Sequence, residues 1–216
     1  DAVKTFMARL FAGPKSPRVV VRIDEIEKAI NASATGAVAD NTGVSQDQLK
    51  TLLTSMEDNR WSGAIFLGGP GTGKTMATAC IGNTFKVTSL VGDLGATKSS
   101  LVGSSEQRIR RMMDVIYSLG GERVMLVATC NKLGIMPPEL LRRFSLGIWH
   151  FSVPSHEDKK SIWRIQMAKY DIPARQEIPD DSDWVGSDIK NCAEKSWMLG
   201  MPLIEAAKFI TISGRV

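Results

Sequence analysis

One short segment carries the side chains and the backbone that phosphate binding requires. Residues Gly68-Gly69-Pro70-Gly71-Thr72-Gly73-Lys74-Thr75 satisfy the pattern G-x-x-x-x-G-K-[ST], between an apolar run and a helix-forming stretch. Glycines let backbone N–H groups turn around a β-phosphate, while Lys74 can reach the β- and γ-phosphates and Thr75 can ligate Mg²⁺. A glycine-rich turn without a ligand is the alternative, but it does not require Lys-Thr at this offset. We therefore expect nucleotide contacts from Gly69, Pro70, Gly71, Thr72, Gly73, Lys74, Thr75 and Met76.

An acidic pair supplies the second group of candidate residues. Asp24-Glu25 follows the β-branched run 19–23, which is typical of a buried parallel strand. Acids at the carboxyl end of such a strand lie where ligand sites form. Asp24 could hold a metal through water, and Glu25 could polarise a water for attack on a γ-phosphate. A surface pair that opens a helix is the alternative, since helix N-termini favour acids.

Alternating strands and helices are expected to position both segments. Strands are predicted at residues 19–23, 64–67, 86–91, 124–129 and 146–153, and helices at 2–11, 45–56, 75–81 and 106–119. This alternation predicts one α/β domain, residues 1–153, with a mostly parallel sheet between helices. Helical patterns at 156–170, 187–199 and 202–210 then predict a small helical domain, residues 154–216. Residues 31–43 have no periodicity and are expected to form a loop.

Composition limits the function classes. The chain has 216 residues, 43% of them hydrophobic, which is enough for one core and a small satellite domain. A net charge of +4 does not require a nucleic-acid partner, so we regard nucleic acid as an unlikely one. No apolar stretch is long enough to cross a bilayer, so a soluble, unexported, cytoplasmic protein is expected. Three widely spaced cysteines favour buried thiols over a zinc site.

Five segments match the motifs of one family. They are Gly68–Thr75, similar to G-x-P-G-T-G-K-T; Ile23–Lys28, similar to I-D-E-I-(D/E)-K; Ala128–Asn131, similar to A-T-x-N; Met136–Phe144, similar to P-x-x-L-L-R…R-F; and Gly186–Ile189, similar to G-A-D-I. Over most of its length the chain thus resembles the AAA+ ATPases, specifically the AAA clade. The resemblance implies the P-loop NTPase fold, with a parallel sheet sandwiched by helices and a C-terminal helical lid.

The resemblance also implies functional roles. ATP and Mg²⁺ would bind at the first motif, called Walker A, with Asp24 and Glu25 as the Walker B acids. Asn131 would position the attacking water as the sensor 1 residue, and Ile162 and Gly186 would lie in the adenine pocket. Lys74 would act in catalysis as well as binding. The predicted partners are further copies of the chain and a protein substrate that is remodelled. The alternative hypothesis is a loader or remodeller of nucleic acid.

Two adjacent arginines, Arg142 and Arg143, imply an oligomer. In the family such arginines reach the γ-phosphate of the neighbouring subunit, so turnover would need a ring, for example a hexamer. Outside this context the two would be solvated charges after a helix. The chain lacks the family's spacer between them, so either arginine could be displaced. Leu101 stands where the family's pore loop has an aromatic residue, which weakens the expected grip on a substrate.

The order of the motifs departs from the family. Walker B precedes Walker A in this chain, whereas in the family it follows Walker A. The family's sheet order is 5-1-4-3-2, and a rewired chain can keep that order without reversing a strand. We therefore expect the acidic strand inside a parallel sheet, whether the order arose by engineering or by natural permutation. A rewired domain that binds nucleotide with weak or no turnover is the alternative function.

Overall fold

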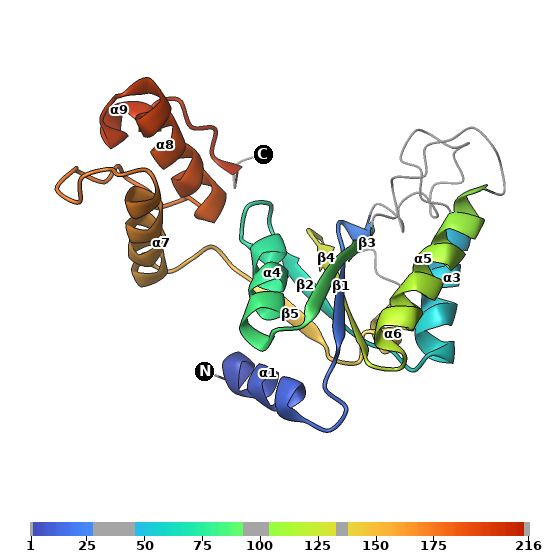
Figure 1. Cartoon of the computed structure of the whole chain (residues 1–216). Coiled ribbons are helices and arrows are strands. Elements are labelled where there is room, and N and C mark those ends of the chain that lie inside the picture. The colour runs from blue at the N-terminus through green and yellow to red at the C-terminus, as the bar shows by residue number, and fades with distance from the viewer. Residues whose placement is uncertain (1, 28–45, 93–103, 133–137, 214–216) are drawn as a thin grey trace. The chain divides into compact units, whose positions relative to one another are not determined.

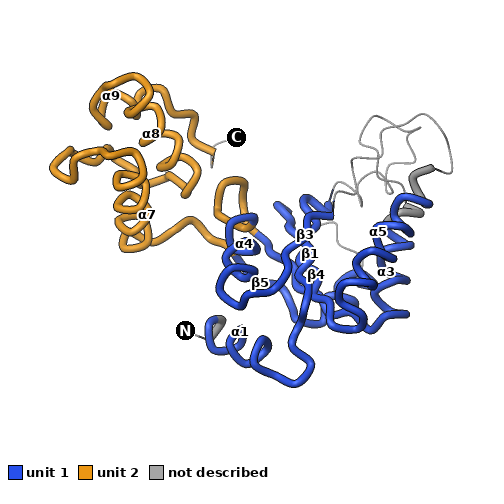
Figure 2. Tube along the Cα trace, in the orientation of Figure 1, with its two compact units in different colours: residues 1–67, 75–150 blue, residues 68–74, 151–216 orange. Residues whose placement is uncertain are grey.

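The computed structural model describes residues 2–27, 46–92, 104–132 and 138–213. Contacts divide the chain into two compact units (Figure 2). Unit 1 comprises residues 1–67 and 75–150, and unit 2 comprises residues 68–74 and 151–216. The predicted domain limits, 1–153 and 154–216, stay a prediction. The expected loop 31–43 and the segment around Leu101 lie outside the described residues.

A five-stranded sheet forms the centre of unit 1 (Figure 1). Its strands are β1 (Val19–Ile23), β2 (Ser62–Gly68), β3 (Thr88–Gly92), β4 (Val124–Cys130) and β5 (Ile148–Phe151), in the spatial order β3-β1-β4-β2-β5. β1 pairs in parallel with both β3 and β4, and β2 pairs in parallel with β4. The chain therefore has the α/β fold of P-loop NTPases, with the glycine-rich loop following β2.

The acidic strand lies inside this sheet, as expected. If the strand before the glycine-rich loop is counted first and the acidic strand third, the observed order reads 5-1-4-3-2. The parallel register places Val19 beside Val124 and Ile23 beside Ala128. The pairing does not depend on chain order, because strands that bury β-branched residues on both faces fit a central position wherever they occur in the sequence.

Burial explains which strands are central. All seven residues of β4 are buried, and four of the five β1 residues are buried. The edge strand β3 buries only Gly92, which fits its place at the end of the sheet. The predicted strands at 86–91 and 146–153 are thus real but shifted or shorter, since β3 covers 88–92 and β5 only 148–151.

Helices cover both faces of the sheet in unit 1. The helices of this unit are α1 (Ala2–Ala12), α3 (Gln46–Asp58), α4 (Lys74–Phe85), α5 (Ser104–Gly120) and α6 (Pro138–Arg143). Figure 1 shows α3 and α5 on one side of the sheet and α4 on the other. Leu52 and Met56 of α3 and Ile109 and Ile116 of α5 join one buried core with the strands. Sequence periodicity did not predict α6, whose six residues bury only Leu140.

Unit 2 contains a second, smaller core. Its helices are α7 (His156–Lys169), α8 (Gly186–Leu199) and α9 (Leu203–Ala207). Trp163 of α7, Ile189 of α8 and Leu203 of α9 meet in a cluster that excludes water. The third helix is shorter than the predicted 202–210 because the chain leaves the helix at Lys208.

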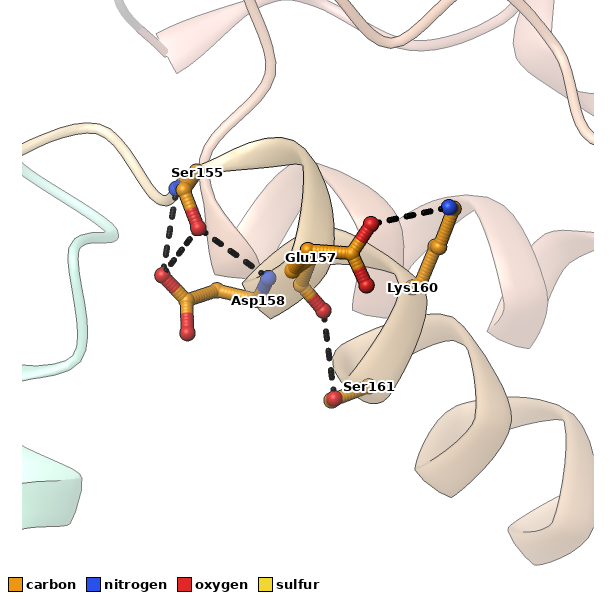
Figure 3. Close-up of polar contacts among 5 residues, drawn as sticks. All are labelled: Ser155, Glu157, Asp158, Lys160 and Ser161. Atoms are coloured by element: carbon orange, nitrogen blue, oxygen red, sulfur yellow. Dashed lines mark hydrogen bonds and ion pairs between the residues drawn. The ribbon is translucent and has the colours of Figure 1, made fainter.

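Ser155 sets where α7 begins (Figure 3). Its Oγ accepts a hydrogen bond from the backbone N–H of Asp158 at 3.2 Å, and its own N–H donates to Asp158 Oδ2 at the same distance. This capping box satisfies two backbone donors that the helix itself cannot pair. The described helices include none that is both long and apolar enough to cross a membrane.

Candidate functional site

The glycine-rich loop between β2 and α4 has the backbone that its sequence predicts. Gly71 and Gly73 have φ values of +74° and +95°, in the left-handed region that side chains rarely adopt. The intervening Thr72 donates its hydroxyl to Gly69 O at 2.8 Å and closes the turn. Left-handed residues alternating with ordinary ones turn successive N–H groups to one side, which makes an anion-binding concavity. The loop therefore fits a phosphate group.

Lys74 places a positive charge inside this loop. Only 8% of the residue is exposed, and its Nζ donates to Gly68 O at 2.6 Å and Gly69 O at 2.7 Å. Carbonyl oxygens compensate the buried ammonium group without neutralising it. A net positive charge therefore remains beside the backbone N–H groups at the start of α4, where phosphate is favoured.

Three predicted nucleotide contacts come together within unit 2. A Cβ atom built on Gly186 would lie 3.6 Å from Gly71 O and 3.8 Å from Ile162 Cδ1. The neighbouring Ser187 donates its N–H to Gly71 O at 3.2 Å, and a Cβ on Gly71 would approach Ser187 Oγ to 2.0 Å. Only glycine fits at position 71. The first turn of α8 and the glycine-rich loop therefore pack directly together, while the roles of these residues towards nucleotide stay predictions.

The acidic segment that follows β1 is tied to the end of β4. Thr129 donates its hydroxyl to Asp24 Oδ1 at 3.1 Å and accepts the Glu25 N–H at 3.0 Å. The Asn131 N–H donates to Glu27 Oε1 at 3.1 Å. Two separate sets of hydrogen bonds thus tie the acidic segment, with Asp24 and Glu25, to the end of β4 and Asn131 in unit 1.

Glu25 has an unusual backbone. Its φ is +54°, a left-handed value that disfavours residues with a Cβ. The other described non-glycine residues with positive φ are Arg60, Lys86 and Asp171, and each of them comes just after a helix, where such a conformation is common. Glu25 instead follows a strand, so its conformation is a local feature of the acidic segment. Strained residues of this kind concentrate at functional sites.

The predicted metal ligands are few. Thr75 lies in the first turn of α4 and is exposed, and Asp24 is exposed beside Arg22, whose Nε donates to Asp24 Oδ2 at 3.0 Å. Among the described residues no group of three or more His, Cys, Asp and Glu side chains could hold a metal. Mg²⁺ needs no such group, because it keeps several waters and is held by one or two protein oxygens plus phosphates. The donor set fits Mg²⁺ with nucleotide and does not fit a zinc centre.

The two arginines differ in their surroundings. Arg143 donates to and forms an ion pair with Glu57 at the end of α3, whereas Arg142 is exposed. Both lie in the last turn of α6, which Leu140 and the adjoining Phe144 anchor to the core. Most of the family-like segment Met136–Phe144 is described, but residues 136 and 137 are not.

Sequence reasoning missed four residues with contacts at these sites: Thr129, Glu27, Ser187 and Glu57. Thr129, Glu27 and Ser187 fall inside motifs that resemble the family, and that was the available signal. Their contacts depend on strand register and on packing between helices, which the motif patterns do not encode. Glu57 carried no signal of its own.

Part of the chain is similar to a known protein family and to curated relatives. The family "ATPase family associated with various cellular activities (AAA)" matches residues 64–120. Uncharacterized AAA domain-containing proteins ycf46 from Trieres chinensis and Gracilaria tenuistipitata var. liui are 23% and 25% identical to the chain, each over 148 residues. Each alignment covers 50% of this chain and 30% of the relative, so the chain spans about a third of their length.

Two similar solved structures are those of the FIGL-1 AAA domain. One covers 86% of this chain and 90% of the FIGL-1 chain, with 15% identity and a TM-score of 0.49. The other, in complex with ADP, covers 84% and 82%, with 17% identity and a TM-score of 0.46. The family match spans β2, the glycine-rich loop, α4, β3 and α5. It shows that this part of the chain is similar to the AAA family of ATPases.

Proposed function

We propose that this module binds ATP with Mg²⁺ and hydrolyses it. The observation that carries the proposal is the loop 68–74, in which two left-handed glycines and a buried Lys74 precede the N-terminus of α4. Each of these features favours a polyphosphate. Backbone N–H groups, the Lys74 charge and the dipole of α4 would all stabilise the same ligand. Mg²⁺, when bound, would neutralise charge on the phosphates.

The remaining residues would divide the chemistry between them. Lys74 would contact the β- and γ-phosphates, Thr75 would ligate the metal, and Asp24 would hold it through water. Glu25 would accept a proton from the attacking water, which Asn131 would help to orient. Gly186 and Ile162 would contact the adenine, since an apolar side chain and an open backbone suit a flat base.

A ring would complete the site. We infer that Arg142 and Arg143 approach the nucleotide of a neighbouring copy, because both stand at the end of the short helix α6 and Arg142 is exposed. A charge supplied by a second subunit makes turnover depend on assembly. The work of the ring would be remodelling of a protein substrate through closure of the helical lid.

The test is Mg²⁺-dependent ATP hydrolysis measured over a range of protein concentrations. We expect turnover per subunit to rise with concentration, and to fall by about 10²- to 10³-fold in Lys74→Ala and in Glu25→Gln. Lys190→Ala and Glu122→Gln remove the same charges at exposed positions and serve as matched controls.

The outcomes separate the rival functions. Loss of turnover in both variants but in neither control supports the ATPase. A chain that binds nucleotide through Lys74 but shows no Glu25-dependent turnover would be a binding module. The rewired chain would then lack catalytic geometry. Stimulation of turnover by single-stranded or duplex DNA, with salt-dependent binding, would instead favour a nucleic-acid remodeller.

A further inference from the structure

Two residues outside the predicted catalytic set hold the acidic segment and the end of β4 together. We propose that Thr129 and Glu27 are positioning residues for hydrolysis: Thr129 orients Asp24 and Glu25, and Glu27 orients Asn131. This inference rests on the proposed ATPase function, because it assigns those three residues to the reaction.

Strand register brings Thr129 to the acids. β1 and β4 run in parallel with Ile23 beside Ala128. The residues that come next, Asp24 after β1 and Thr129 within β4, therefore lie side by side in the same register. Thr129 is only 3% exposed, and its hydroxyl makes two bonds at once, donating to Asp24 Oδ1 and accepting from Glu25 N. A hydroxyl can do both, whereas an apolar side chain of the same shape can do neither.

The bond to Glu25 holds a strained conformation. Glu25 has a φ of +54°, which costs a residue with a Cβ about 1–2 kcal/mol relative to the ordinary right-handed or extended regions. Such a conformation persists only where the surroundings determine it. The Thr129 hydroxyl accepts the Glu25 N–H and is therefore one of the contacts that keep the carboxylate of Glu25 aimed where the backbone directs it.

Asp24 is oriented from two sides. Its Oδ1 accepts from Thr129, while its Oδ2 accepts from Arg22 on the same strand. Arg22 is a neighbour of Asp24 in the sequence, whereas Thr129 is 105 residues away and belongs to the central strand. Thr129 therefore fixes Asp24 relative to the sheet, and Arg22 fixes only the rotation of its carboxylate.

Glu27 positions Asn131 in a similar way, through a hydrogen bond to its backbone N–H. The Glu27 residue is 9% exposed, and its Oε1 accepts the Asn131 N–H directly after the end of β4. Among the described residues Oε2 of Glu27 has no hydrogen-bond partner, which is costly for a buried carboxylate. One acceptor oxygen is all that the Asn131 N–H needs, so Gln should replace Glu at this position and Ala should not.

The first test needs no nucleotide. Backbone amide hydrogen exchange of the full chain is measured by NMR in Thr129→Val, Thr129→Ser, Glu27→Ala and Glu27→Gln. We expect exchange at Glu25 to be about tenfold faster in Thr129→Val, and exchange at Asn131 to be about tenfold faster in Glu27→Ala, because each loses one hydrogen bond. Thr129→Ser and Glu27→Gln keep the acceptors and should exchange like the parent chain at both amides.

A reference amide separates this effect from general loosening. Leu126 lies in the buried middle of β4, three residues before Thr129 and five before Asn131. If Thr129→Val accelerated exchange at Leu126 as much as at Glu25, the variant would be loosening the sheet, and the positioning role would be overturned. Unchanged exchange at Glu25 in Thr129→Val, or at Asn131 in Glu27→Ala, would overturn it equally.

The second test uses turnover and separates the two residues. Since Thr129 orients the carboxylate expected to hold the metal, Thr129→Val should raise the Mg²⁺ concentration for half-maximal turnover by about 10- to 100-fold. Glu27→Ala should lower kcat by about tenfold. It should leave the Mg²⁺ concentration for half-maximal turnover and the KM for ATP unchanged. Thr129→Ser should restore most of the Mg²⁺ dependence that Thr129→Val loses, and Glu27→Gln should restore most of the kcat that Glu27→Ala loses.

The outcomes distinguish this inference from the proposed function. A parent chain without any turnover overturns the ATPase proposal, and with it the catalytic meaning of the two residues. The other case is a parent chain that turns over ATP. If Thr129→Val then keeps the parent's Mg²⁺ dependence, or if Thr129→Ser loses as much turnover as Thr129→Val, the ATPase proposal stands and only the positioning roles are overturned.

Discussion

Two segments of the candidate site each follow a strand of the sheet, β2 or β1, but they are held in different ways. The glycine-rich loop 68–74 is shaped mainly by its own glycines, by Thr72 and by the bonds from Lys74 to Gly68 and Gly69, all within six residues. The Ser187 N–H adds a bond from α8 to Gly71 O. The acidic segment 24–27 is held by the Thr129 side chain in β4 and by the Asn131 backbone N–H just after it, each about 104 residues away. The loop is thus a local structure, whereas the acidic segment takes its shape from the tertiary fold.

This difference predicts how the two segments tolerate change. A local loop should fail when one of its own residues is replaced and should survive changes elsewhere in the sheet. A segment that depends on strand pairing should fail when its distant partner is replaced, even if its own sequence is intact.

Three glycines of the loop should differ strongly when each is replaced by alanine. Gly71 combines positive φ with a Cβ clash at 2.0 Å from Ser187 Oγ, Gly73 has positive φ with open space, and a Cβ on Gly69 meets nothing closer than 4.0 Å. We expect Gly71→Ala to destabilise unit 2 by about 2–5 kcal/mol, the sum of strain and overpacking. Gly73→Ala should cost about 1–2 kcal/mol and Gly69→Ala well under 1 kcal/mol.

Thermal and urea unfolding followed by tryptophan fluorescence measure this series, since Trp163 and Trp184 lie in the core of unit 2. An equal loss of stability in all three variants would show that the backbone conformation of the loop does not decide its tolerance. The local character of the loop would then be wrong.

Cysteine alkylation compares the surroundings of the two segments directly. Cys80 is exposed in α4 after the glycine-rich loop, whereas Cys130 is buried at the end of β4 beside the acidic segment. Burial also raises the pKa of Cys192 to about 11, so at pH 8 its thiolate fraction should be about 100-fold below that of an ordinary thiol. Iodoacetamide labelling read by mass spectrometry should modify Cys80 first.

The labelling also has a pH signature. Because the Cys192 pKa is raised, its labelling rate should keep rising as the pH increases from 8 towards 11. Fast labelling of Cys130 at pH 8 would mean that the end of β4 opens readily, which would contradict a rigid anchor for the acidic segment.

Asp188 tests whether the glycine-rich loop also depends on distant side chains. It is fully buried in the first turn of α8, next to Ser187, and accepts from Val185 N at 3.1 Å and Ser213 Oγ at 2.6 Å. Asp188→Ala leaves these donors unpaired and should destabilise unit 2 by about 2 kcal/mol. Glu177→Ala, at an exposed site, is the control. A matching loss of ATP affinity in Asp188→Ala would weaken the contrast, because the loop would then rely on the lid.

The ion pair between Arg143 and Glu57 should matter least for stability. Both side chains are substantially exposed, so Glu57→Gln should change the free energy of unfolding by less than about 1 kcal/mol, and 1 M salt should remove the difference. Urea unfolding at two salt concentrations measures it. A larger, salt-independent loss would show that α6 depends on α3 for its position, as the acidic segment depends on β4.

The sequence indicated the elements better than their mutual contacts. The glycine-rich loop, β1, β2 and β4 follow from composition and order, because apolar β-branched runs and glycines act locally. The α6 helix escaped prediction since six residues are too few to show periodicity. Thr129 could not be assigned a role, because its bond to Asp24 exists only in the register that pairs Ile23 with Ala128. The parallel placement of β1 was expected from the family's sheet order and is confirmed.

The early place of β1 in the chain has a consequence for synthesis on the ribosome. β1 is translated first among the strands, yet both of its neighbours, β3 and β4, are translated later. Loop closure over a hundred residues must precede its pairing with β4, which slows the search for the native contacts. The apolar run Val19–Ile23 therefore waits unpaired while most of the domain emerges. Its early exposure makes it the strand for which a nascent chain would most need protection from aggregation.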